Sequence, residues 1–173
     1  VCVTPVDFVD KAITIAHMPD FIVTTFGDMM RVPGSSTSLL REKAMGADVR
    51  IVYSPLDALS IACKNPQKKV VFLGVGFETT APTIGASILN AAEQEINNFF
   101  VLCAHKTMPQ AMNALTADPE LKIDGYLCPA HVSTIIGAEA YKPLSTARNI
   151  PCVITGFEPV DILQGIEMLV RQI

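Results

Sequence analysis

Short apolar runs that alternate with longer helix-like segments constrain the fold of this chain more than any other feature. Each run has the length of a β-strand, and a segment with helical periodicity follows it. The six runs are residues 21–26, 49–54, 70–76, 99–105, 125–129 and 152–156. Such alternation predicts parallel sheets covered by helices, whose strands are apolar throughout because both of their faces are buried. The sequence therefore predicts an α/β fold.

The six strand–helix segments also align as two sets of three. The stretch LGVGFETTAP corresponds to VITGFEPVDI, VYSPLDALSI to YLCPAHVSTI, and TTFGDMMRVP to LCAHKTMP, each pair with a similar offset. A near-constant offset of this size is typical of an ancient duplication rather than of a solenoid. We therefore expect two similar parallel-sheet βα domains, residues 1–97 and 98–173, with three βα units each, facing each other across a cleft.

Composition and charge exclude several classes of function. The formal charge of −4 gives no basic surface for nucleic acid. No apolar run approaches the roughly 18 residues that a membrane span needs, so we expect a soluble protein. Five cysteines without a Cys-x-x-Cys pair favour a reduced, cytoplasmic protein over a disulfide framework. The low charged fraction, 17%, and a first residue other than Met indicate an excised segment with surface that a partner or further chain covers.

Polar residues gather where the predicted strands end, which is where parallel α/β sheets bind ligands. Glu78, Thr79 and Thr80 follow the third run, and His131 and Ser133 follow the fifth. Glu78 either only caps the next helix, whose N-cap is expected at Thr79 or Thr80, or accepts hydrogen bonds and orients a reacting group. A second Gly-Phe-Glu brings Glu158 to the equivalent place in the other half, which favours the chemical role for Glu78.

Two Cys–His pairs and one loop leave further alternatives open. Cys128 precedes His131 at a spacing that zinc ligands use, but a zinc site needs more ligands, and a structural histidine fits equally well. The same alternatives hold for Cys103 and His105. Residues 31–40 combine a glycine turn with hydroxyl residues at a helix start, a pattern that can hold an anion. Nucleotide binding has weak support, because neither a Walker loop nor a complete dinucleotide fingerprint is present.

Taken together, the stretches VCVTP, FGDMMRVPGS, GADVRIVYSPLDAL, VVFLGVGFETTAP, PAHVSTIIG and GFEPVDILQGIEMLV resemble the HypD family of hydrogenase maturation factors. The resemblance covers almost the whole chain in the expected order. It implies a cytoplasmic scaffold for the iron centre of [NiFe]-hydrogenases, on which iron carries two cyanide ligands and one carbon monoxide ligand, Fe(CN)2CO. It also implies two partners, a small HypC-type chaperone and HypE, through which cyanide is received.

The resemblance further implies roles for particular residues. Cys2 matches the last cysteine of the family's Gly-Pro-Gly-Cys-Pro-Val-Cys motif and would be a metal ligand for iron. Glu78, Thr79 and Thr80 match the Gly-Phe-Glu-Thr-Thr motif, and His131 and Ser133 match the Pro-x-His-Val-Ser motif; together they would line the cleft between the domains.

Parts of the family pattern are missing from this sequence. The upstream Cys-Gly-Thr-His motif, the first cysteine of the Cys-Pro-Val-Cys stretch and the downstream domain with a 4Fe-4S cluster are absent. We therefore expect only part of the site here, in a metallocentre scaffold with a possible redox role rather than a conventional turnover enzyme. Two alternatives remain: a small-molecule enzyme with Glu78 and His131 as acid and base, and a partner-binding module without chemistry.

Overall fold

The computed structural model describes residues 4–172, and their contacts divide the chain into two units. The first unit takes in the chain up to Gly76 together with Thr80–His105. The second takes in Phe77–Thr79 and the chain from Lys106 onward. The short segment Phe77–Thr79 thus belongs by its contacts to the second unit, although the first unit continues on both sides of it.

A parallel sheet forms the centre of the first unit. Its described strands are β1 (Phe21–Thr25), β2 (Val49–Ile51), β3 (Lys69–Gly76) and β4 (Phe99–His105), in the order β2-β1-β3-β4. β3 is paired on both edges and its residues 70–75 are buried, which explains its continuous apolar sequence. The register places Gly74 beside Cys103 and Gly76 beside His105.

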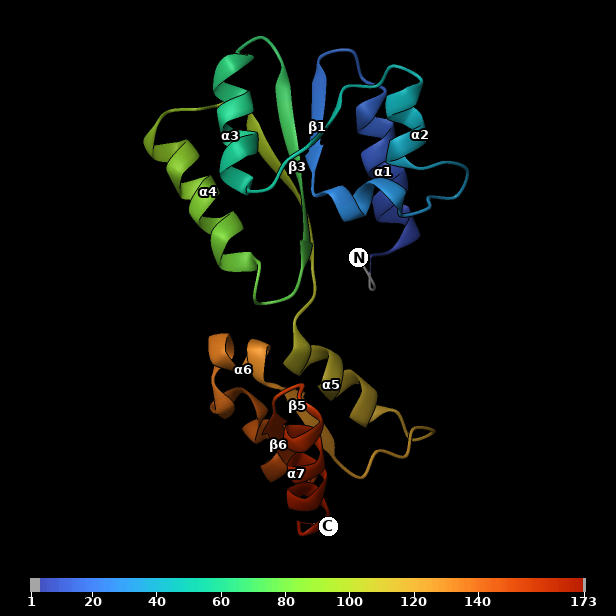
Figure 1. The fold of residues 1–173 in the computed structure, drawn as a ribbon, viewed down its shortest axis with the longest axis vertical. Helices are drawn as coiled ribbons and strands as arrows, with labels where there is room; N and C mark the ends of the chain where they lie inside the picture. Colours follow the sequence, from blue (N-terminus) through green and yellow to red (C-terminus); the bar gives the residue numbers. More distant parts are fainter. Residues whose placement is uncertain (1–3, 173) are drawn as a thin grey trace. The chain divides into compact units, whose positions relative to one another are not determined.

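Helices cover both faces of this sheet (Figure 1). One face packs against α1 (Val6–Ala16), the 3-10 helix η1 (Gly27–Arg31) and α2 (Leu39–Ala44), with Leu73 and Val75 of β3 in that core. The other face packs against α3 (Pro55–Lys64) and α4 (Ala81–Glu93), with Val70 and Phe72 in that core. The alternation of β3 side chains between the two cores follows from the two-residue period of a strand.

The second unit contains a smaller parallel pair, β5 (Tyr126–Pro129) and β6 (Cys152–Thr155). Its helical elements are α5 (Met108–Ala117), α6 (Ala130–Ile136), η2 (Ala138–Tyr141), a π-helical turn η3 (Pro143–Ala147) and α7 (Pro159–Val170). Met112, Cys128, Tyr141 and Leu144 form its buried core.

Helix α7 approaches β5 and β6 closely through Gly165, the residue that it buries. A Cβ atom at Gly165 would lie 3.0 Å from Thr155 and 3.2 Å from Leu127. Most other apolar side chains of α7, including Val160, Leu163 and Val170, are exposed, while Leu169 is half-buried near Gly125. This unit therefore carries apolar surface that its described residues leave uncovered.

The predicted α/β class with parallel strands is confirmed, and all six apolar runs form strands. The sequence predicted three strands in each domain. In the described residues one sheet has four strands and the other has two, because β4 pairs with β3. The units consequently part after His105, whereas the sequence suggested a division after Asn97.

Helix α1 was not predicted. The arrangement of the two domains across a cleft stays a prediction. No helix within residues 4–172 is long and apolar enough to cross a bilayer.

Asn98 joins the start of β4 to the end of α3, and its replacement should destabilise the first unit. Its Nδ2 donates to the carbonyl oxygens of Ala62, Asn65 and Lys68 at 3.0, 3.1 and 2.9 Å. Asn98→Ala removes these three hydrogen bonds, although the Ala62 and Asn65 carbonyls keep backbone donors, and we expect the free energy of unfolding to fall by about 1–3 kcal/mol. Urea unfolding followed by far-ultraviolet circular dichroism measures this change.

Asn97→Ala is the matched control, because Asn97 is exposed and its amide donates only to the nearby Glu95 carbonyl among the described residues. We expect its effect to stay within about 0.5 kcal/mol. Equal losses in the two variants would contradict the anchoring role of Asn98.

Candidate functional site

Gly76 forms the turn that takes the chain from β3 to Glu78. Its φ of 137° lies in a region that L side chains rarely adopt. A Cβ atom at this position would also collide with the side chain of Thr80. The glycine of the Gly-Phe-Glu-Thr-Thr stretch is therefore required by the backbone geometry.

The carboxylate of Glu78 is anchored at the start of helix α5. Its Oε1 atom accepts a hydrogen bond of 2.7 Å from the backbone N–H of Met108, the first residue of that helix. The positive end of the helix dipole favours a carboxylate in this place. The Oε2 atom is buried and has no hydrogen-bond partner within residues 4–172. One oxygen of Glu78 is thus fixed while the other remains able to accept a proton or a hydrogen bond.

This arrangement differs from simple capping of the helix that follows Glu78 in the sequence. That helix is α4, and its N-cap is Thr80, one of the two residues expected. Thr79, the other, is half-buried in the same turn as Glu78.

Ser133 and Tyr141 form a buried hydroxyl pair in the same unit as Glu78. The Ser133 hydroxyl donates to the carbonyl oxygen of Pro129 at 2.8 Å and lies 3.0 Å from the Tyr141 hydroxyl. Because the Ser133 hydrogen is directed to Pro129, Tyr141 acts as the donor to Ser133. Burial raises the pKa of Tyr141, and the negative charge of Glu78 adds to this shift, while the Ser133 hydrogen bond opposes it. Tyr141 is therefore a neutral hydrogen-bond donor, and the sequence analysis missed it.

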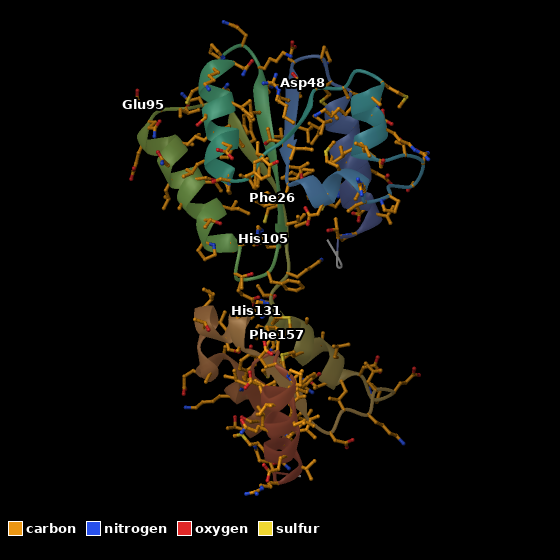
Figure 2. All side chains as sticks on the ribbon, viewed as in Figure 1. Phe26, Asp48, Glu95, His105, His131 and Phe157 are labelled. Carbon is orange, nitrogen blue, oxygen red and sulfur yellow. The ribbon has the colours of Figure 1, made fainter. Side chains whose placement is uncertain are left out.

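His131, which was predicted together with Ser133, is not part of the buried hydroxyl pair. Its side chain is exposed, and its ring centroid lies 5.1 Å from that of Phe157 (Figure 2). Cys128 is buried instead, and burial together with neighbouring Cys152 raises the pKa of its thiol to about 12. Within residues 4–172 no three Cys, His, Asp or Glu side chains lie close enough to hold a metal ion.

The predicted Thr80 lies in the first unit, near the ends of β3 and β4. Its Oγ1 atom is 3.1 Å from Nε2 of His105, and the other ring nitrogen, Nδ1, is 3.3 Å from Sγ of Cys103. The Gly-Phe-Glu-Thr-Thr stretch thus contributes Glu78 to the second unit and Thr80 to the first.

The second Gly-Phe-Glu repeats neither the positive-φ turn nor the buried carboxylate oxygen. A Cβ atom at Gly156 would collide with the Asp161 side chain, as one at Gly76 would with Thr80, but Gly156 does not have a positive φ. Glu158 is exposed and is itself the N-cap of α7, without a side-chain capping hydrogen bond, whereas the N-cap after Glu78 is Thr80. The two glutamates therefore differ in both backbone position and surroundings.

Two further predictions concern Cys2 and the anion-binding loop of residues 31–40. Cys2 lies outside the described residues, so its role as an iron ligand stays a prediction. The predicted anion loop, which includes Arg31, lines a cavity of about 280 Å³ in the first unit together with Arg41.

Replacing Gly76 by alanine should destabilise the fold and displace Glu78. The substitution forces an L residue to a φ of 137° and places its Cβ against Thr80, so we expect the free energy of unfolding to fall by about 1–3 kcal/mol. Gly85→Ala is the control, because a Cβ there meets nothing within 4 Å in helix α4. We expect this variant to gain about 0.5–1 kcal/mol. Urea denaturation compares the two, and similar losses would contradict the steric argument.

The electrostatic contact between Glu78 and Tyr141 predicts a change in the titration of the phenol. Glu78→Gln removes a negative charge that disfavours the phenolate, so the pKa of Tyr141 should fall. Glu158→Gln removes an exposed carboxylate from the same unit and should leave that pKa unchanged. Nuclear magnetic resonance of ring-labelled tyrosine, titrated with pH, reports each phenol separately. An unchanged or higher Tyr141 pKa in Glu78→Gln would contradict the contact.

Comparison with known proteins identifies the family. The model described as "HypD: Hydrogenase formation hypA family" matches residues 1–173. The chain is 49% identical over 172 residues to hydrogenase maturation factor HypD of Escherichia coli (strain K12), covering 99% of this chain and 46% of that protein. It is 50% identical over 173 residues to HypD of Rhodobacter capsulatus, covering 100% of this chain and 46% of that protein.

Similarity to HypD of Azotobacter vinelandii is of the same order, 48% over 179 residues, with 100% of this chain and 47% of that protein covered. The chain thus spans about half the length of the curated relatives it matches. The family match extends over the whole sequence and includes both the Gly-Phe-Glu-Thr-Thr and the Pro-x-His-Val-Ser stretches, so the chain belongs to the HypD family.

Proposed function

We propose that this chain acts in hydrogenase maturation, as the part of a scaffold on which the Fe(CN)2CO unit of [NiFe]-hydrogenases is assembled. Membership of the HypD family supports the general role, since the matched relatives are named hydrogenase maturation factors. In this proposal the iron with its diatomic ligands is the cargo of the protein. A HypC-type chaperone and a HypE-type cyanide donor are the proposed partners.

The observation that carries the proposal is the half-anchored carboxylate of Glu78. Its Oε1 atom is fixed by the N–H of Met108, and its buried Oε2 atom has no hydrogen-bond partner among the described residues. A buried oxygen of this kind normally has a partner, because an unsatisfied polar atom is destabilising. A ligand or a protonated group that binds during assembly would supply that partner.

Most of the motif residues have a role in this proposal. Cys2 supplies a thiolate, a soft ligand that suits iron carrying cyanide and carbon monoxide. Glu78 accepts a hydrogen bond at Oε2, and Thr79 belongs to the turn that positions it. Ser133, with Tyr141 as its donor, keeps a neutral hydroxyl pair in the same unit. His131 is exposed and is accessible to a partner.

A 4Fe-4S cluster does not fit the described residues. Such a cluster needs several thiolates together, whereas residues 4–172 bring no three potential ligands into one group. We therefore propose that any cluster belongs to the part of the full-length relatives that this chain does not span.

Protein binding is a second role with its own support. Helix α7 exposes Val160, Leu163, Ile166, Met168 and Val170. Exposed apolar patches of this kind mark surfaces that a partner or further chain covers. The alternative of a small-molecule enzyme receives no comparable support, because Glu78 is anchored against α5 while the His131 ring lies in a tilted contact with Phe157. A cytoplasmic location stays a prediction.

Infrared spectroscopy tests the proposal directly. The intact protein is purified anaerobically with its HypC-type partner, and bands of iron-bound cyanide and carbon monoxide are expected. Cys2→Ser should remove the bands together with the bound iron. Glu78→Gln should reduce them about tenfold or more, as loss of a group that orients a metal site typically does.

Glu158→Gln is the matched control, since it removes the exposed glutamate of the second Gly-Phe-Glu and should keep the bands. Absence of the bands from a folded, iron-loaded complex would overturn the scaffold role. Full bands in Glu78→Gln would instead remove Glu78 from the mechanism.

A further inference from the structure

Cys103 and His105 lie side by side at the carboxyl end of β4, outside the group around Glu78. Residues two apart on a strand point to the same face of the sheet. Their register partners on β3 are Gly74 and Gly76, which have no side chains. The face around the thiol and the imidazole is therefore left open by the neighbouring strand, and Cys103 is exposed.

Hydrogen bonds connect this pair to Thr80. The Thr80 hydroxyl donates to the carbonyl oxygen of Val75 at 3.4 Å and lies 3.1 Å from Nε2 of His105. We assign the ring proton to Nε2, because Nε2 can then donate to Thr80 while the hydroxyl keeps its hydrogen bond to Val75. The other nitrogen, Nδ1, is then unprotonated and accepts from the Cys103 thiol at 3.3 Å. A thiol, a base and a group that orients the base thus form one chain.

The surroundings of His105 keep its ring in this position and in its neutral form. A Cβ atom at Gly74 would lie 3.4 Å from Cε1 of His105 and 2.9 Å from Cγ1 of Val101, so the glycine leaves room for the imidazole. Burial lowers the pKa of His105, which keeps the ring neutral near pH 7 and available as a base (Figure 2 labels this histidine).

We propose that Cys103 is a reactive thiol that exchanges with small-molecule disulfides, with His105 as its base and Thr80 as the residue that orients His105. Nδ1 of His105 takes the thiol proton, and the Cys103 sulfur attacks one sulfur of the disulfide. A new sulfur–sulfur bond forms at Cys103 as the bond in the small molecule breaks. The leaving thiolate takes the proton from His105 and departs as a thiol. Cys103 is oxidised to a mixed disulfide, and half of the small disulfide is reduced.

Cys63 gives an internal reference for this reaction. It is also exposed, on helix α3, and makes no described contact with an imidazole. Cys128 is buried and serves as a sensor of correct folding, because it should react only when the second unit opens.

The test measures how fast each cysteine of the intact, reduced protein forms a mixed disulfide with bis(hydroxyethyl) disulfide. Reaction mixtures are quenched with acid and analysed by peptide mass spectrometry, which counts Cys2 and every other cysteine separately. At pH 6 we expect Cys103 to react about fivefold faster than in His105→Gln, because the thiolate is the attacking form and low pH otherwise suppresses it. By pH 9, where hydroxide ionises the thiol without help, the ratio should fall to about one or below.

Two variants separate activation from loss of structure. In His105→Gln and in Thr80→Val the rate at Cys63 should stay unchanged and Cys128 should stay unmodified. Thr80→Val keeps the imidazole but loses its orienting hydroxyl, so its Cys103 rate at pH 6 should fall between those of the wild type and His105→Gln. Equal Cys103 rates at pH 6 in the wild type and His105→Gln would overturn the proposal, as would a Cys103 that reacts no faster than Cys63. Neither result bears on iron assembly, since the inference is independent of the scaffold role.

Discussion

Burial of β3 on both faces is the constraint on which the rest of the first unit depends. Its side chains alternate between two helix-covered cores, and its edges pair with β1 and β4. β3 is held by packing on both faces and by pairing on both edges. The strand ends at Gly76, where a positive φ changes the direction of the backbone. The positions of Glu78 and Thr80 follow from that turn. Packing in the core thus determines where the motif's polar groups are placed.

The buried thiol of Cys128 and the buried phenol of Tyr141 differ in charge from Glu78 of the same unit. Burial raises the pKa of Cys128 and Tyr141, so both keep their protons near neutral pH. Glu78 in contrast receives a backbone N–H from the start of α5, which favours a negative charge. The second unit thus combines groups that keep their protons with a carboxylate whose buried Oε2 atom has no hydrogen-bond partner among the described residues.

Much of the fold was predictable from the sequence because it rests on local patterns. Apolar runs of strand length gave all six strands. Helix α1 also had a local signal, since Phe8, Val9, Ala12, Ile13 and Ala16 recur at helical spacing, but it lies outside the six predicted strand–helix segments.

What could not be predicted depends on pairing between distant segments. The attachment of β4 to β3 is a choice of sheet partner, and no feature within residues 99–105 specifies it. Glu78 meets Met108, 30 residues further along the chain, and Tyr141 joins Ser133 only after Gly137 ends helix α6. Motif similarity selected the candidate residues, whose functional roles stay predictions, whereas their division between two units came from tertiary structure alone.

The strand order β2-β1-β3-β4 also affects how the chain can be synthesised safely. β3 gains its partner β1 from chain made earlier, but its other edge stays open until residues 99–105 have left the ribosome. An unpaired edge on so apolar a strand is a template for association with another nascent chain. The helix made in between, α4, packs on one face of β3 and leaves that edge uncovered. The strand order thus leaves the outer edge of β3 without its native partner throughout the synthesis of the segment between β3 and β4.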